Sequence, residues 1–130
     1  MKLPFWIPAF LGLAACNTVG SGAIPKAIPE GVPRKINTYY SINQDCTADP
    51  GILGRVVVAP ENGRVSFRPG ADYPSYPRTN SRYRCNLKKA PSVQLWYTPN
   101  PGFRGSDSTI VEALYPDGTV IKRTFTIDVR

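Results

Sequence analysis

Residues 96–129 read WYTPNPGFRGSDSTIVEALYPDGTVIKRTFTIDV, and this stretch decides the fold. Its end, residues 124–129, alternates polar and apolar residues, as in a strand with one buried face. Residues 108–115 are also β-prone, and the Pro-Asp-Gly at 116–118 is typical of a turn. The pattern therefore predicts a β-hairpin over residues 108–130.

Four segments upstream also have the composition of short strands. They are residues 36–42, 55–59, 64–68 and 93–97. The second and third flank Pro-Glu-Asn-Gly at 60–63, where Asn-Gly supplies the positive φ that a tight hairpin requires. We therefore expect these two segments to form a second hairpin.

The composition of the whole chain agrees with an all-β protein. It has 130 residues, enough for one domain, and 42% of them are hydrophobic, so a core can form. It contains 14 prolines and 11 glycines but one methionine, and no long stretch has helical periodicity. Six or seven short strands separated by turns predict an antiparallel β-sandwich of two sheets.

Residues 54–129 resemble the bacterial immunoglobulin-like and cadherin-like modules of exported proteins. The positions that carry the resemblance are Tyr97, Pro99, Gly102, Phe103, Gly105, Asp107, Asp117, Gly118 and Val129. The resemblance implies an immunoglobulin-like sandwich, a fold that hosts many unrelated functions. The chain departs from these modules because it has one copy and a long insertion at residues 68–91.

The N-terminal residues 1–15 are typical of an export signal. An apolar run follows Lys2 and is too short to span a membrane. It ends at Leu-Ala-Ala before Cys16, which resembles the lipobox of bacterial lipoproteins. The resemblance implies a lipidated Cys16 and a membrane-anchored protein of the cell envelope, with the outer membrane favoured because Asn17 is not aspartate. The alternative is an ordinary cleaved signal followed by a spare cysteine.

Lipidation of Cys16 would leave Cys46 and Cys85 as one pair in a compartment where disulfides persist. We therefore expect one disulfide; two buried thiols are the alternative. After the lipidated cysteine, residues 16–35 are rich in Pro and Gly and read as a flexible tether. The folded domain is then expected to cover residues 36–130.

The insertion contains the candidate binding loop. No acidic residue lies between Asp72 and Asp107, whereas basic and tyrosine residues alternate there. The candidate residues are Tyr73, Tyr76, Arg78, Arg82, Tyr83, Arg84, Lys88 and Lys89. Such side chains bind phosphates, carboxylates and sugars, so the expected partner is an anionic envelope polymer or an acidic protein. The alternative is a solvated loop whose charge serves solubility.

Other functions are disfavoured. Without Lys2 the chain has 15 basic and 9 acidic side chains, a net charge of +6, but export removes nucleic acid as a partner. The chain has no histidine and no recognisable nucleophile and base, so we predict no enzyme activity, no cofactor and no metal. A structural subunit that adds strands to its neighbours and a small inhibitor of a hydrolase are the alternatives to a binding lipoprotein.

Overall fold

The computed structural model describes residues 2–4 and 22–130. The expected lipidation site Cys16 and all but three residues of the expected leader lie outside these ranges. No helix within the two ranges is long and apolar enough to span a membrane.

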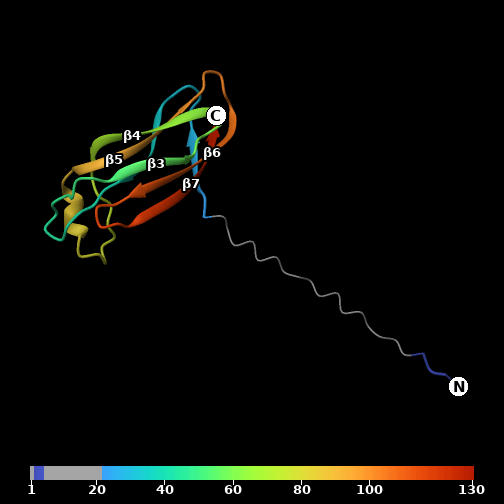
Figure 1. Ribbon diagram of the computed structural model, residues 1–130, viewed down its shortest axis with the longest axis horizontal. Coiled ribbons are helices and arrows are strands. Elements are labelled where there is room, and N and C mark those ends of the chain that lie inside the picture. Colours follow the sequence, from blue (N-terminus) through green and yellow to red (C-terminus); the bar gives the residue numbers. More distant parts are fainter. Residues whose placement is uncertain (1, 5–21) are drawn as a thin grey trace.

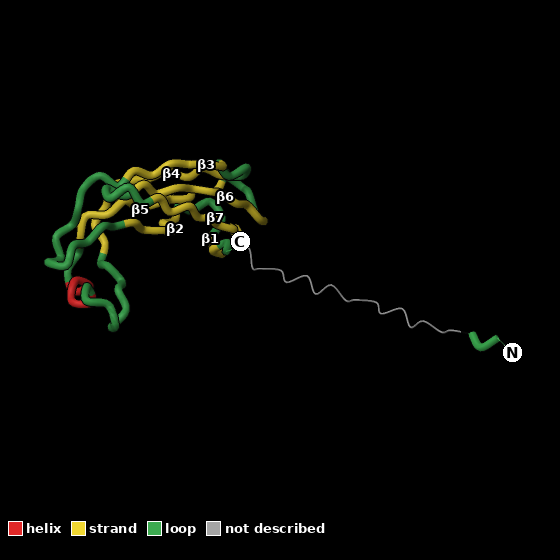
Figure 2. Tube along the Cα trace, turned by 60° about the horizontal axis from the view of Figure 1, so that its bottom comes forward, coloured by secondary structure: helices red, strands yellow, loops and turns green. Residues whose placement is uncertain are grey.

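The described part of the chain is a sandwich of two β-sheets, as the sequence predicts (Figures 1 and 2). One sheet has four strands in the order β1-β7-β6-β3, and the other has three in the order β2-β5-β4. The strands are β1 (Ile24–Ile28), β2 (Arg34–Tyr39), β3 (Leu53–Val58), β4 (Gly63–Asp72), β5 (Ala90–Pro99), β6 (Gly105–Leu114) and β7 (Val120–Val129). A short 3-10 helix, η1 (Tyr83–Leu87), lies between β4 and β5.

The core lies between the two sheets and is built by the predicted alternation. On β7, Phe125, Ile127 and Val129 are each at most 2% exposed, whereas the residues between them face solvent. On β5, Leu95 and Tyr97 are fully buried and face them from the other sheet. Burial of these side chains provides the main stabilisation of the sandwich.

The hairpin predicted over residues 108–130 is confirmed. Strands β6 and β7 pair antiparallel over their whole length, from Gly105 opposite Val129 to Leu114 opposite Val120. At the turn, Gly118 has a φ of +88°, a conformation that residues with a Cβ rarely adopt.

The second predicted hairpin, across residues 60–63, is wrong. β3 pairs with β6 and β4 pairs with β5, so the connection passes from one sheet to the other. Gly63 has no positive φ; it is instead needed for close packing. A Cβ there would lie 2.6 Å from the Thr98 carbonyl oxygen and 2.7 Å from the Tyr97 ring. Glycine is therefore required at position 63 by packing, and the Asn-Gly pair does not form a tight turn.

The expected tether also ends earlier than predicted, because β1 belongs to the sandwich. It pairs parallel with the second half of β7, so the four-stranded sheet is not wholly antiparallel. Ile28 is 4% exposed and joins the core, and Ile24 packs against it. Pro25 is tolerated because β1 is an edge strand. The folded domain therefore begins by residue 24, and β2 begins at Arg34 rather than at Ile36.

The predicted disulfide between Cys46 and Cys85 is present. The insertion is shorter than expected, because residues 68–72 belong to β4 and β5 begins at Ala90. The remaining segment, residues 73–89, lies at the end of the sandwich opposite the C-terminus in both views (Figures 1 and 2).

Candidate binding surface

The inserted segment packs against residues 40–49, and we call the two segments 40–49 and 73–89 together the loop lobe. A second, small hydrophobic cluster lies between it and the start of β5. Ile42, Cys85 and Ala90 are its buried members, and Tyr40, Cys46, Ala48 and Tyr76 pack on them. The disulfide joins the two segments at this cluster, so the lobe is fixed by a covalent bond as well as by packing.

Polar contacts fix the conformation of residues 73–89 further. The Tyr76 amide donates to Asn86 Oδ1 at 2.9 Å, and Asn86 Nδ2 donates to the Tyr76 carbonyl at 2.8 Å. The Ser75 amide donates to the Tyr40 hydroxyl at 3.1 Å. Ser81 Oγ donates to Gln44 Oε1 at 2.8 Å. The loop is therefore preorganised by its own hydrogen bonds, which lowers the entropy that a partner must remove.

Two of the three candidate arginines serve this framework. Arg82 Nε donates to the Ile42 carbonyl at 2.7 Å, and Arg84 Nη2 donates to the Gln44 carbonyl. Arg82 is half-buried, whereas Arg84 remains largely exposed. These two guanidinium groups hold the two segments together, so their removal would alter the lobe itself.

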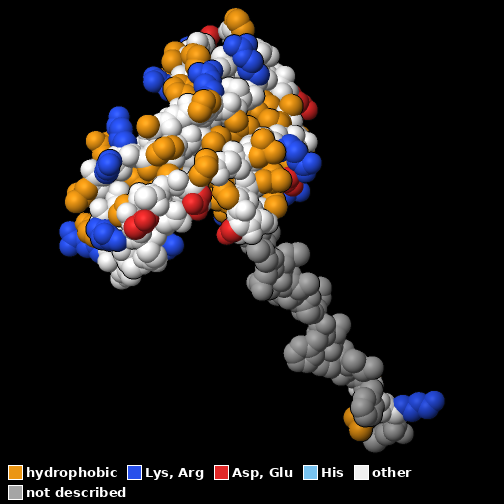
Figure 3. Space-filling view, turned by 60° about the vertical axis from the view of Figure 1, so that its left-hand side comes forward, with side chains coloured by type: hydrophobic (Ala, Val, Ile, Leu, Met, Phe, Trp, Pro, Cys, Tyr) orange, Lys and Arg blue, Asp and Glu red, His pale blue; other side chains and the backbone are white. Residues whose placement is uncertain are grey.

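The other candidate cations face solvent. Arg78 lies 6.0 Å from the ring centre of Tyr83, and Lys89 lies 5.6 Å from that of Tyr73. Lys88 is also exposed. Figure 3 views the molecule with this end turned forward, and its Lys and Arg side chains alternate with hydrophobic ones there.

The tyrosines of the loop also divide into two groups. Tyr73 is 58% exposed and Tyr83 is 43% exposed, so their rings are accessible. Tyr76 is half-buried and makes an edge contact with Tyr40, with ring centres 5.7 Å apart. Burial raises the pKa of the Tyr76 hydroxyl, so it stays neutral. Tyr76 is thus part of the framework rather than of the accessible surface.

The net charge of the lobe is positive. Its five basic residues are those named in the candidate loop, and its two acidic residues are Asp45 and Asp49, so the net charge is +3. Asp45 accepts hydrogen bonds from the Thr47 hydroxyl at 2.6 Å and from the Thr47 amide at 3.1 Å, and these lower its pKa. Asp49 accepts from Asn43 Nδ2 at 2.9 Å. Both carboxylates support the turn that contains Cys46.

A polar network on the outer face of the three-stranded sheet was missed by the sequence reasoning. Asp72 accepts hydrogen bonds from Lys35, from Ser92 Oγ at 2.5 Å and from Gln94 Nε2 at 2.8 Å. Partial burial raises the pKa of this carboxyl, but its three hydrogen bonds outweigh burial and lower the pKa to about 2. The network joins residues that are far apart in the sequence, so no local pattern indicates it.

The same network orients Trp96. Its Nε1 donates to Gln94 Oε1 at 2.9 Å, and the Arg68 guanidinium stacks on its ring at 4.9 Å from the centre. Gly70 permits this arrangement, because a Cβ there would lie 2.4 Å from the Gln94 side chain. One partial signal was present in the sequence, since Arg68 and Trp96 lie at outward positions of neighbouring strands.

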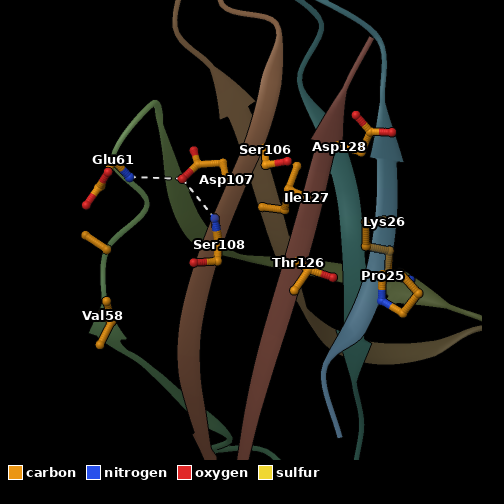
Figure 4. A pocket seen from close by; sticks show the side chains of 11 residues that line it. Pro25, Lys26, Val58, Glu61, Ser106, Asp107, Ser108, Thr126, Ile127 and Asp128 are labelled. Carbon is orange, nitrogen blue, oxygen red and sulfur yellow. Dashed lines mark hydrogen bonds between the residues drawn. The ribbon is translucent and has the colours of Figure 1, made fainter. Parts of the chain in front are cut away.

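A hollow of about 750 Å³ lies over β1, β6, β7 and the connection between β3 and β4 (Figure 4). Asp107 is its most buried charged residue, and it is engaged in the fold. It accepts hydrogen bonds from the amides of Glu61 at 3.0 Å, Asn62 at 3.1 Å and Ser108 at 2.9 Å. The Tyr97 hydroxyl also donates to it at 2.8 Å, and burial together with this carboxylate raises the pKa of Tyr97. Asp107 therefore fixes the crossing between the sheets.

The described residues contain no group of three or more Cys, Asp or Glu side chains that could hold a metal ion. Two of the aspartates of the Gly-rich turns have local structural partners. Asp107 holds the sheet crossing, and Asp117 accepts from the Thr119 amide at 2.9 Å. That contact lowers the pKa of Asp117, as an aspartate-stabilised turn requires.

No family model matches the chain, and no curated protein matches it in sequence. Among solved structures, the solution structure of amebosin is similar with a TM-score of 0.43 and 14% sequence identity. The alignment covers 82% of this chain and 88% of amebosin. At this level the similarity supports no inference about function.

Proposed function

We propose that the protein is a lipid-anchored lipoprotein of the bacterial cell envelope whose immunoglobulin-like domain binds an anionic partner without catalysing a reaction. The partner is an anionic envelope polymer or an acidic protein surface. The apolar leader and the lipobox before Cys16 support the location. The favoured membrane is the outer one.

One observation carries the binding proposal: Arg78, Lys88 and Lys89 are exposed on a lobe whose conformation is already fixed. Exposed cations on a rigid surface can bind a polyanion without a large ordering cost. Arg78 and Lys89 lie close to exposed tyrosine rings, which adds flat surfaces suitable for sugars. The chain has no histidine, and both cysteines of the lobe are oxidised, which supports a role without catalysis.

The test is capture of the detergent-purified full chain on beads coated with polygalacturonate, a model polyanion. Electrostatic capture should weaken steeply as salt rises to about 0.15 M, where charges are screened beyond about 8 Å. The variant with Arg78→Gln, Lys88→Gln and Lys89→Gln should lose most of the capture. A control with Arg34→Gln, Arg64→Gln and Lys122→Gln has the same net charge and should keep it. Equal loss in both variants would reduce the proposal to a general charge effect.

The anchor has its own test. Mass spectrometry of the intact protein from a bacterial membrane should give a chain that begins at Cys16 with added diacylglycerol and acyl mass. A chain that begins elsewhere, or has a free thiol at Cys16, contradicts the proposed location.

A second candidate function, strand addition within an envelope assembly, is favoured by β3. This strand is an edge of the four-stranded sheet, and Leu53 is 63% and Val58 is 48% exposed. Exposed apolar edge strands are templates for pairing with another chain. If the protein acts by strand addition, Val57→Lys should abolish crosslinking to its partner in the cell envelope at any salt concentration. If it binds through the loop lobe, the same change should have no effect.

A further inference from the structure

A second hollow, of about 390 Å³, lies where the edge of β2 meets the end of β4. Its volume falls within the roughly 300–1,000 Å³ of small-molecule sites. The lining is mainly polar and includes Lys26, Lys35, Thr38, Asp72, Tyr73 and Ser75. Tyr40, Tyr73 and Ser75 of the loop lobe also line it, but none of the exposed lobe cations Arg78, Lys88 and Lys89 does.

Lys26 is half-buried, and it lines both this hollow and the hollow of about 750 Å³ described above. It lies on β1 opposite Ile127, whose side chain is in the core, so both side chains are on the inner face of the sheet. An edge position directs Lys26 toward the open side of the sandwich, where it lines the hollow together with residues of β2. Within residues 22–130 no carboxylate lies in salt-bridge range of Lys26, so its charge is available to an anion.

Asp72 supplies a fixed acceptor beside this cation. Its Oδ2 accepts from Ser92 and Gln94, and its Oδ1 accepts from Lys35. The Lys35 ammonium balances the carboxylate charge of Asp72. The Lys26 ammonium therefore gives the hollow a net positive charge. Oδ1 has a single protein partner and retains a free lone pair that can accept a hydroxyl proton.

Tyr73 forms an aromatic wall of the hollow. It is 58% exposed, and Lys89 lies 5.6 Å from the centre of its ring. Ser75, on the same segment, is held by the hydrogen bond of its amide to the Tyr40 hydroxyl. A flat ring beside hydroxyl and carboxylate groups suits the alternating C–H and O–H groups of a sugar.

We propose that this hollow binds one acidic sugar residue, with Lys26 binding the sugar carboxylate, Asp72 accepting a sugar hydroxyl and Tyr73 covering one sugar face. The inference rests on the proposed binding of an anionic partner and names its chemical class as a uronate-containing glycan. A bare inorganic anion fits less well, because it would use neither the Tyr73 ring nor the Asp72 carboxylate, which would repel it.

The test is calorimetric titration of the detergent-purified full chain with galacturonate, and with galactose and acetate as comparisons. Galacturonate should bind saturably. Galactose and acetate should each bind at least about tenfold more weakly, because galactose lacks the carboxylate and acetate lacks the sugar ring and its hydroxyls. Lys26→Gln and Tyr73→Ala should each weaken galacturonate binding by about tenfold, whereas Lys26→Arg should restore most of it. Lys122→Gln is the matched control and should leave binding unchanged.

The outcomes separate this inference from the proposed function. Galacturonate binding that survives in the variant lacking Arg78, Lys88 and Lys89 but fails in Lys26→Gln supports the hollow. Polymer capture that depends on the lobe cations, without saturable galacturonate binding, overturns the inference and leaves the proposed function intact. Equal affinity for acetate and galacturonate would also overturn it, because the site would then bind any small anion.

Discussion

The sandwich and the loop lobe are stabilised in different ways. The sandwich has ten buried apolar residues in one cluster between two sheets. The lobe contributes two, Ile42 and Cys85, to a small cluster with Ala90 of β5, and it adds one disulfide and several side-chain hydrogen bonds. The sandwich is therefore specified by hydrophobic alternation, whereas the lobe depends on a few specific contacts. A single substitution should therefore alter the conformation of the lobe more than that of the sandwich.

The disulfide provides the largest test of this difference. Replacing Cys46 and Cys85 with serine opens a loop of 39 residues and should lower the free energy of unfolding by about 4 kcal/mol. Chemical denaturation measures the loss. The sandwich should remain folded in dilute buffer, with hydrogen exchange faster in residues 73–89 than in β5–β7. Uniformly faster exchange would mean that the two regions are one cooperative unit.

Asp107 tests the sheet crossing, and its effect should be the next largest. Asp107→Ala leaves the amides of Glu61 and Asn62 and the Tyr97 hydroxyl without their acceptor, at a cost of about 3 kcal/mol in unfolding free energy. Thermal denaturation checks this value.

Two tyrosines give a matched pair for the same argument. Tyr97→Phe should cost about 1–2 kcal/mol, because its hydroxyl donates to Asp107. Tyr39→Phe should cost nothing, because the buried Tyr39 hydroxyl has no hydrogen-bond partner among the described residues. Equal losses in thermal stability would contradict the assigned role of Asp107.

Substitutions of Arg82 and Arg78 distinguish an arginine that stabilises the lobe from one that is exposed on its surface. Arg82→Gln removes the bond to the Ile42 carbonyl and should cost about 1.5 kcal/mol. Arg78→Gln should change stability by less than about 0.5 kcal/mol, because its side chain is exposed. Urea denaturation of both variants gives the comparison. A larger loss for Arg78 would mean that its guanidinium holds the lobe.

Apart from the comparison variants Tyr39→Phe and Arg78→Gln, Asp72 should give the smallest effect, as a dependence on pH. Its pKa is about 2 in the folded protein and 3.8 for an ordinary aspartate side chain, so its contribution is present above pH 4 and is lost as pH falls toward 2. Because the partner Lys35 side chain is 37% exposed, screening limits the contribution to about 1 kcal/mol. The wild type should lose this much more stability than Asp72→Asn between pH 4 and pH 2. Parallel losses in thermal denaturation would contradict the role of this carboxylate.

The comparison also explains what could be predicted from sequence. Alternation in β7 and the Pro-Asp-Gly turn are local, so the β6–β7 hairpin and the all-β class were predictable. The tether was predicted to end too late, because Pro25 and Pro29 masked the buried Ile28 and the partly buried Ile24 of a parallel edge strand. The Asn-Gly signal failed because Gly63 is required by contact with Tyr97, which is distant in sequence.

The candidate surface was predictable in composition but not in roles. Net charge and tyrosine content located the loop, and the cysteine count gave its disulfide. No local pattern could separate Arg82 and Arg84, which bind backbone carbonyls, from Arg78, which faces solvent. These roles depend on residues 40–49, which lie next to residues 73–89 only in the folded chain.

The most direct test of the account compares polygalacturonate capture by the oxidised chain and by the Cys46→Ser, Cys85→Ser variant, under conditions where β5–β7 remain protected from hydrogen exchange. The account predicts that the variant keeps its sandwich and all its positive charges but loses most of its capture, because the cations no longer share one fixed surface. Undiminished capture by the variant would contradict the claim that the disulfide-held lobe is the binding surface.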